Sequence, residues 1–281
     1  MAPTYLITLT HFLNFLTAYT HTILHLRHLY PPSSFLRSKF HNTPVFQSRH
    51  PALCAWISDA VAAVRQELLN GAVARIAVVI YHVPTEGGKT GQAKVIERYM
   101  LDVSHFPVVS KAEREMELVY DGSDTEQDPD ETVDTLPTSK AKGKEKAKPL
   151  DEDVDVDLSE QFRAALVVLT TRCSQLAPLP PNCSFNISLE LKDEADADPP
   201  VGHPQAWIPV QPSLQKTGRG RTLNPTVEDE GGAEGGRREG ADLGGVKTTP
   251  IRAVEAGVLR FETWVEEARA KYDIQGDDSQ G

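Results

Sequence analysis

The sequence predicts an α+β fold in which three helices pack on a mainly antiparallel sheet. In some segments apolar residues recur every three or four positions, which is typical of helices. In others they run continuously or alternate, which is typical of strands. Prolines and an Asn-Gly pair indicate where individual elements end. A glycine-rich turn joins two of the predicted strands as a hairpin, so that part of the sheet is antiparallel.

Composition narrows the possible functions before any motif is considered. The chain has 281 residues and a formal net charge of -11. This charge argues against a general phosphate-binding surface, because nucleic-acid affinity depends largely on Lys and Arg. The three cysteines, Cys54, Cys173 and Cys183, form no CxxC pair. Such a sparse, odd set is typical of reduced and mostly buried thiols inside a cell.

The first predicted helix covers residues 8–29. Tyr30-Pro31 ends it, because proline disfavours helical geometry in the residue before it. No Asp or Glu precedes Asp59, so a mitochondrial presequence or a weak membrane span is an alternative for this apolar start. Threonines and histidines interrupt the apolar run, however. We therefore expect a core helix, followed by an extended arm.

The next segments predict a helix and a strand hairpin. The second helix covers residues 51–69, where proline suits the first turn and Asn70-Gly71 suits the end. The β-branched apolar run at 75–82 predicts a central strand. Residues 84–91 form a glycine-rich turn, and residues 95–103 return as the second strand.

Charged stretches divide the predicted domain. Residues 111–157 are acidic, then basic, then acidic, and residues 216–247 are rich in glycine and charge. Such compositions bury too little apolar area to offset the entropy of ordering. We expect both to be disordered insertions, and residues 273–281 to be a disordered tail. The lysine cluster of the first insertion is either a nuclear localisation signal or a solvated run. The folded domain then has two parts, residues 1–110 and 158–272.

The second part contains a helix, a strand, an arm and one ambiguous element. Residues 158–173 have a helical pattern, and residues 184–192 alternate as a half-exposed strand. An irregular, proline-rich arm at 199–210 carries Trp207. The last element, residues 251–272, fits both a helix and a strand, and the pattern alone slightly favours a helix.

A set of short sequence pieces, none specific alone, occurs in a characteristic order: Leu29-Tyr-Pro31, Phe35, Phe40, His50-Pro-x-Leu53, Ile76-Ala-Val-Val-Ile80, Arg163-Ala164, Pro180-Pro-x-Cys-x-Phe185, Trp207-Ile208 and Trp264-Val-Glu-Glu267. In this order they resemble the HORMA-domain family. The most similar branch is that of the mitotic-arrest-deficient-like accessory subunits of translesion DNA polymerase zeta. The resemblance covers nearly all of the chain outside the insertions. The spindle-checkpoint branch is less similar, for example at His50-Pro51.

The resemblance implies a HORMA fold with a C-terminal safety belt. By this resemblance, the arm after Lys192 would cross the sheet and trap an extended, proline-containing peptide of the partner, which for the polymerase branch is the catalytic subunit of DNA polymerase zeta. The peptide adds to a strand edge by β-augmentation. Trp56, Trp207 and Ile208 would contact the peptide. Core packing is the alternative for Trp56, and pinning of the arm is the alternative for Trp207. The resemblance also makes the last element a strand through about Glu266.

Two further surfaces follow from the resemblance. Thr248, Glu262 and Trp264 would dock the C-terminal domain of a companion translesion polymerase. On a strand, Trp264 shares the polar face with Arg260 and Glu262, and an exposed Trp between charges indicates a protein-binding patch. On a helix, Trp264 would be an edge residue. Arg163 matches a surface where HORMA domains pair with one another, and a solvated helix arginine is the alternative.

No arrangement in the ordered segments predicts catalysis, a cofactor or a bound metal. His21, His25 and His28 share a helix face, but no local Asp, Glu or Cys completes a metal shell. The run Asp151-x-Asp153-x-Asp155 lacks the glycine and the closing glutamate of an EF-hand. Together with the resemblance, this implies a noncatalytic nuclear adaptor in translesion synthesis, without specific nucleic-acid or membrane binding. A HORMA signalling adaptor of the mitotic checkpoint or the meiotic chromosome axis is the alternative.

Overall fold

The structure is a computed structural model. It describes residues 4–86, 89–90, 93–116, 118, 150–192 and 246–278. The helices are α1 (Tyr5–Leu26), η1 (Pro32–Ser34), α2 (Pro51–Asn70), α3 (Leu150–Gln175) and α4 (Arg269–Asp278). The strands are β1 (Phe35–Phe40), β2 (Thr43–Ser48), β3 (Val73–His82), β4 (Thr85–Glu86), β5 (Lys89–Thr90), β6 (Lys94–Asp102), β7 (Cys183–Leu191), β8 (Val246–Ala256) and β9 (Leu259–Ala268).

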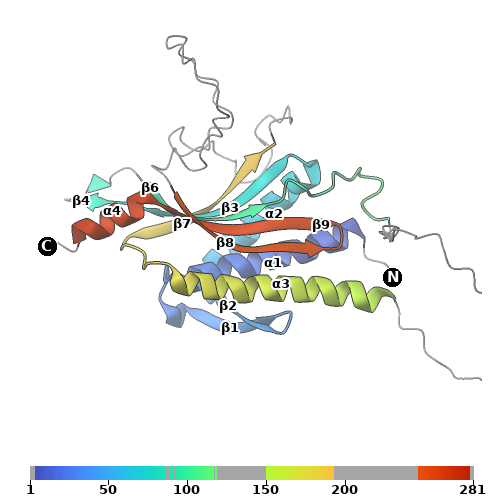
Figure 1. The fold of residues 1–281 in the computed structure, drawn as a ribbon, viewed down its shortest axis with the longest axis horizontal. Helices are drawn as coiled ribbons and strands as arrows, with labels where there is room; N and C mark the ends of the chain where they lie inside the picture. The colour runs from blue at the N-terminus through green and yellow to red at the C-terminus, as the bar shows by residue number, and fades with distance from the viewer. Residues whose placement is uncertain are drawn as a thin grey trace, which may run out of the picture.

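These elements form three layers. A five-stranded sheet with the order β7-β3-β6-β9-β8 is antiparallel throughout. Helices α1 and α3 lie between this sheet and the β1–β2 hairpin, and α4 extends from one end of the molecule (Figure 1). The predicted α+β fold class is confirmed. Among the described residues, no helix is both long and apolar enough to cross a membrane.

Helix α1 lies at the centre of the core. The Thr4 side chain caps its start by accepting the Ile7 N–H. Phe15 of α1 stacks on Phe162 of α3, with ring centroids 4.7 Å apart. Phe12 of α1 meets Phe261 of β9 edge-on at 5.2 Å. The N-terminal helix thus joins the later elements through one aromatic cluster.

The predicted helix at 51–69 and the predicted hairpin at 75–103 are confirmed. Helix α2 begins at Pro51 and is followed by Gly71 in the left-handed conformation, with φ 72. A Cβ atom at Gly71 would lie 2.8 Å from a methyl carbon of Val108, so the close approach also favours glycine. Strands β3 and β6 pair antiparallel, with Ile76 opposite Leu101. The predicted turn between them contains the short β4–β5 pair.

The arm after α1 folds as a hairpin, which the sequence did not predict. Strands β1 and β2 pair with Phe40 opposite Thr43, so His41 and Asn42 form a two-residue loop. Both loop residues have positive φ, 45 and 57, as a type I′ turn requires. The usual signal for this turn is Asn-Gly or Asp-Gly, and neither occurs here.

The helical pattern favoured for residues 251–272 was wrong, and the strand implied by the resemblance through about Glu266 is confirmed. This segment contains most of β8 and all of β9, which turn at Gly257 with φ 60. Phe261 and Val265 point into the core while Glu262 is exposed. Two antiparallel strands buried on one face therefore matched a helical repeat by coincidence.

Three segments were predicted to be disordered, and each overlaps a described element at one end; strand β8, for example, begins at Val246, inside the predicted insertion 216–247. Helix α3 begins at Leu150, inside the predicted insertion 111–157. Acidic residues favour the first turns of a helix through its dipole, which explains why a charged stretch can begin one. Helix α4 extends to Asp278, into the predicted tail 273–281. The stretches 119–149 and 193–245, which include the proline-rich arm, lie outside the described residues.

Candidate functional site

The outer side of strand β7 is the first candidate site. Strand β7 pairs with β3 along its whole length, from Cys183 opposite His82 to Leu191 opposite Val73. Within the described part of the chain, no strand lies on its other side. An edge strand of this kind offers N–H and C=O groups to another extended chain.

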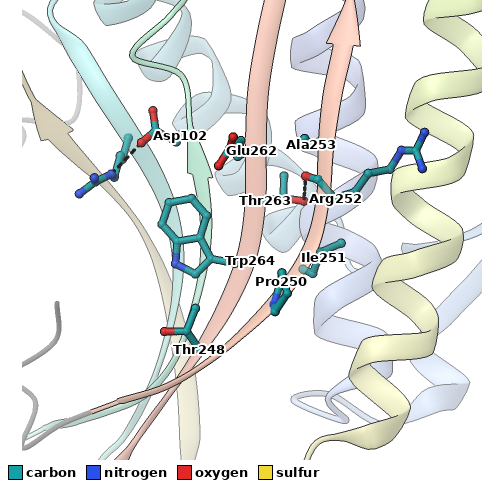
Figure 2. A pocket seen from close by; sticks show the side chains of 10 residues that line it. Asp102, Thr248, Pro250, Ile251, Arg252, Ala253, Glu262, Thr263 and Trp264 are labelled. Carbon is teal, nitrogen blue, oxygen red and sulfur yellow. Dashed lines mark hydrogen bonds and ion pairs between the residues drawn. The ribbon is translucent and has the colours of Figure 1, made fainter. Parts of the chain in front are cut away.

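The opposite edge of the sheet is covered by helix α3. Arg172 of α3 donates from Nε to the carbonyl oxygen of Pro250 in β8 at 3.1 Å. Arg252 of β8 donates to Gln161 of α3 at 3.0 Å, and Figure 2 shows its side chain reaching toward that helix. Pro250 also lacks an N–H for an added strand. The two edges of the sheet therefore differ in their capacity to accept a partner.

Residues 193–245 connect these two edges. Strand β7 ends on one edge of the sheet, and β8 begins on the other. Trp207 and Ile208 belong to this segment and lie outside the described residues. Their roles in peptide binding stay predictions.

Trp56 lies beside the β7 edge. Its ring, on helix α2, meets the ring of Phe185 in β7 edge-on, with centroids 5.1 Å apart and planes at 80°. The indole is half-buried and also packs against the core. The structure thus places Trp56 next to the strand that a peptide would extend, while its contact with a peptide stays a prediction.

The second predicted surface is one continuous depression on the sheet face opposite α1 and α3. Thr248 of β8 lines it together with Glu262 and Trp264 of β9, and its volume is about 530 Å³ (Figure 2). Arg75 of β3 and Asp102 of β6 complete its floor. The three residues named from the sequence are therefore neighbours, and docking of a second polymerase there stays a prediction.

Sequence reasoning missed the charged residues that hold Trp264 in place. The Arg75 guanidinium carbon lies 5.9 Å from the centroid of the Trp264 ring, within cation–π distance. Arg75 also donates to Asp102 Oδ2 at 3.0 Å and to Glu190 Oε2 at 3.2 Å. The Trp264 indole N–H donates to Glu266 Oε1 at 2.9 Å. The only sequence signal was that Arg75 and Asp102 flank apolar strands.

The charges around this depression persist at neutral pH. Burial acts to raise the pKa of Asp102, but hydrogen bonds from Ser104 and the ion pair with Arg75 lower it overall. Burial likewise acts to lower the pKa of Arg75, and its bonds to Asp102 and Glu190 raise it overall. The depression therefore presents an indole among fixed charges of both signs.

Arg163 lies on the exposed side of helix α3. Its guanidinium is 3.5 Å from Glu160 Oε1, one turn earlier in the helix. Val167, one turn later, is an exposed apolar residue. This surface is accessible to a second domain, and HORMA pairing through Arg163 stays a prediction.

Among the described residues, no group of three or more His, Cys, Asp or Glu side chains could hold a metal ion. His21 accepts the N–H of Ser48, and burial lowers its pKa, so it packs as a neutral imidazole. Burial raises the pKa of both Cys173 and Cys183 to about 11. Both thiols are protonated at neutral pH and are poor nucleophiles.

The fold described above agrees with the result of comparing this sequence with known protein families. The model of the HORMA domain matches residues 9–210, which is more than half of the chain. The chain belongs to the HORMA-domain family. The resemblance inferred from the ordered sequence pieces is thereby confirmed.

Relatives of this HORMA protein include a polymerase subunit and checkpoint proteins. It is 25% identical over 252 residues to the DNA polymerase zeta processivity subunit of Schizosaccharomyces pombe, covering 90% of this chain and 89% of that protein. It is 29% identical over 96 residues to the mitotic spindle assembly checkpoint protein MAD2B of Homo sapiens, covering 34% of this chain and 42% of that protein. A chain of the mitotic checkpoint complex has the same fold, with a TM-score of 0.54 at 12% identity and coverage of 91% of this chain and 96% of that chain.

Proposed function

We propose that this HORMA protein is a noncatalytic adaptor subunit of DNA polymerase zeta that acts in translesion DNA synthesis in the nucleus. The observation that carries the proposal is the similarity to the Schizosaccharomyces pombe processivity subunit, which extends over 90% of this chain and 89% of that protein. A match over almost both lengths is not confined to one part of the fold.

Capture of a peptide from the catalytic subunit is the first activity proposed. The peptide would pair with the outer side of β7 and form main-chain hydrogen bonds as an added strand. The Trp56–Phe185 pair lies at this edge and offers an apolar contact for the peptide's side chains. Residues 193–245, with Trp207 and Ile208, would pass over the bound peptide between their two anchors. A segment that has to move before release slows dissociation, where most affinity differences arise.

Docking of a second translesion polymerase is the second activity proposed. The depression formed by Thr248, Glu262 and Trp264 would receive its C-terminal domain. An indole anchored by a hydrogen bond to Glu266 and by Arg75 is a rigid aromatic surface, and such residues dominate protein interfaces. Because this depression and the β7 edge are separate, one adaptor could hold both partners. Pairing of two HORMA domains at Arg163 would use a third surface.

Isothermal titration with two ligands tests the assignment. The ligands are a synthetic proline-containing peptide of the catalytic subunit and the purified C-terminal domain of the companion polymerase. Trp207→Ala is expected to weaken peptide binding by about tenfold or more, or about 1.4 kcal/mol, and to leave domain binding unchanged. Trp264→Ala is the matched control, with the opposite expectation. Unchanged peptide affinity in Trp207→Ala would reject the capture mechanism.

A signalling adaptor of the mitotic checkpoint is the second candidate function. It is favoured by the similarity to MAD2B, which is named as a mitotic spindle assembly checkpoint protein. That match covers 34% of this chain, so it supports the candidate less strongly. Affinity purification with mass spectrometry separates the two functions. Recovery of checkpoint activators in place of polymerase subunits would favour the signalling adaptor.

A further inference from the structure

A group of charged side chains lies inside the domain, away from both candidate surfaces. Glu97 and Lys271 are 0% exposed and Glu267 is 1% exposed. Lys271 Nζ donates to Glu97 Oε1 at 2.6 Å and to Glu267 Oε1 at 2.5 Å. Arg27 donates to both carboxylate oxygens of Glu97, at 3.0 and 2.8 Å. We call Arg27, Glu97, Glu267 and Lys271 the buried clasp.

The clasp joins elements that are far apart in sequence. Arg27 caps the end of α1, Glu97 lies in β6, Glu267 in β9 and Lys271 in α4. Glu97 and Glu267 are direct partners in the β6–β9 pair. Like charges directly opposite each other on neighbouring strands destabilise the pairing. The pairing of β6 with β9 at this position therefore depends on the cations of the clasp.

Lys271 and Arg27 contribute differently to the clasp. Arg27 also donates to the carbonyl oxygens of Cys173 and Ala177 in the region where α3 ends, and it forms an ion pair with Glu97. Lys271 bonds both carboxylates. Lys247 lies 3.7 Å from Glu267 Oε2, but its side chain is 68% exposed and water screens it. Lys271 is thus the side chain that joins the two carboxylates across the strands.

The clasp also lies at the start of β8, directly after residues 193–245. Lys247 of β8 is opposite Glu267 of β9, and Val246 is opposite Ala268. Residues 193–245 therefore enter β8 beside the clasp. Phe261 fastens the other half of β9 to the aromatic cluster. The C-terminal half of β9 and the start of β8 form a unit that is attached to β6 by the clasp and by the buried ion pair between Arg98 of β6 and Glu266 of β9, 2.7 Å apart.

We propose that Lys271 is the release element of this unit. With Lys271 in place, the carboxylates of Glu97 and Glu267 are bridged and β9 stays on β6. When the first turn of α4 unwinds and withdraws Lys271, Glu97 keeps its bonds to Arg27, but Glu267 loses its buried cation and faces the Glu97 carboxylate in the interior. Residues 265–268 and 246–249 then separate from β6, while β3 and the Phe261 half of β9 stay in place. This opening frees the start of β8 from the sheet. The inference stands independently of the proposed polymerase role.

Hydrogen exchange on the full chain without partners tests the proposal. In Lys271→Met, the amides of residues 265–268 and 247–249 are expected to exchange about a hundredfold faster, because a broken buried ion pair leaves an uncompensated charge. The amides of Ile76 to Ile80 in β3 should exchange at the wild-type rate. Lys247→Met is the matched control and should change neither group. Equal acceleration in β3, or no acceleration at 265–268, would overturn the proposal.

A second variant tests the role of repulsion. Lys271→Met combined with Glu267→Gln keeps the shape of the side chain and removes one of the opposed charges. Exchange at 265–268 should return to within about tenfold of wild type. Exchange as fast as in the single variant would show that repulsion is not the cause of release.

Amine acetylation of the wild-type protein decides the matter if Lys271→Met does not fold. Lys271 should react far more slowly than the exposed Lys247. The factor by which its reaction is slowed should equal the protection factor of the 265–268 amides. If the reaction of Lys271 is instead slowed by the same factor as exchange of the β3 amides, which report global unfolding, the proposal is overturned.

Discussion

The two sides of the sheet are fastened by different interactions. On one side, the aromatic cluster, the buried clasp and contacts with α3 hold β9 and β8. On the other side, β7 is tied to its neighbours on the outer face by Arg75, whose side chain is 29% exposed. Its partners Asp102 and Glu190 are 20% and 27% exposed. Interior ion pairs are lost at high cost when broken, whereas partly exposed pairs contribute little and are screened by salt. The β7 side, which could accept a peptide, is thus the side whose ion pairs stabilise it less.

Removing Phe261 should break the firmly held side. Phe261→Ala deletes a ring that contacts Phe12, Phe15 and Phe162, and it leaves a cavity between α1, α3 and β9. We expect the free energy of unfolding to fall by about 3–5 kcal/mol, measured by urea denaturation. Leu36→Ala, at an exposed apolar position, should change it by less than about 0.5 kcal/mol. A loss below about 1 kcal/mol for Phe261→Ala would contradict this account of the core.

Removing Arg75 should loosen the β7 side with a smaller effect. Arg75→Met keeps a long apolar stem and deletes the ion pairs to Asp102 and Glu190. We expect a loss of about 1 kcal/mol at low salt, and the difference from wild type should shrink at high salt. Arg260→Met serves as control, because the Arg260–Glu255 pair is largely exposed. A difference that persists undiminished at high salt would indicate that Arg75 acts through packing.

Of the three changes, acid should lower the stability contributed by the β7 side by the smallest amount. The pKa of Asp102 in the folded protein is below its ordinary value of 3.8. Its stabilisation is therefore complete above pH 3.8 and is lost as the pH falls through the lowered pKa. Asp102→Asn should be less stable than wild type near neutral pH by less than about 1 kcal/mol. In acid denaturant titrations the two proteins should converge, and a constant gap would show that Asp102 does not titrate as stated.

The sequence predicted best those elements that its own local signals delimit. Helix α2 was predicted correctly because Pro51 and Asn70-Gly71 mark its two ends. Residues 251–272 were misjudged because Val254, Phe261 and Val265 are buried in two strands, yet their spacing also fits a helix. The Gly257 turn was the available signal, and it carries little weight without knowledge of the neighbouring strands. The β1–β2 hairpin was missed because its loop, His41-Asn42, is not the Asn-Gly or Asp-Gly pair that usually indicates a type I′ turn.

The candidate sites were predictable only in part. Trp264 and Glu262 share an outer face because strand alternation is a local property, so the strand interpretation located them correctly. Arg75 and Asp102 join the depression through pairing of separate strands, which no local pattern specifies. The clasp has one local component, the Glu267–Lys271 pair at i and i+4. Its other component, Glu97, comes from a strand far earlier in the chain.

The central position of helix α1 determines when the protein can complete its fold during synthesis. This helix leaves the ribosome well before its aromatic partners Phe162 and Phe261. Until translation reaches β9, the rings of Phe12 and Phe15 lack the surfaces that cover them. Long-range pairing of this kind slows folding and exposes apolar surface. The nascent chain consequently requires protection from aggregation until β9 has been synthesised.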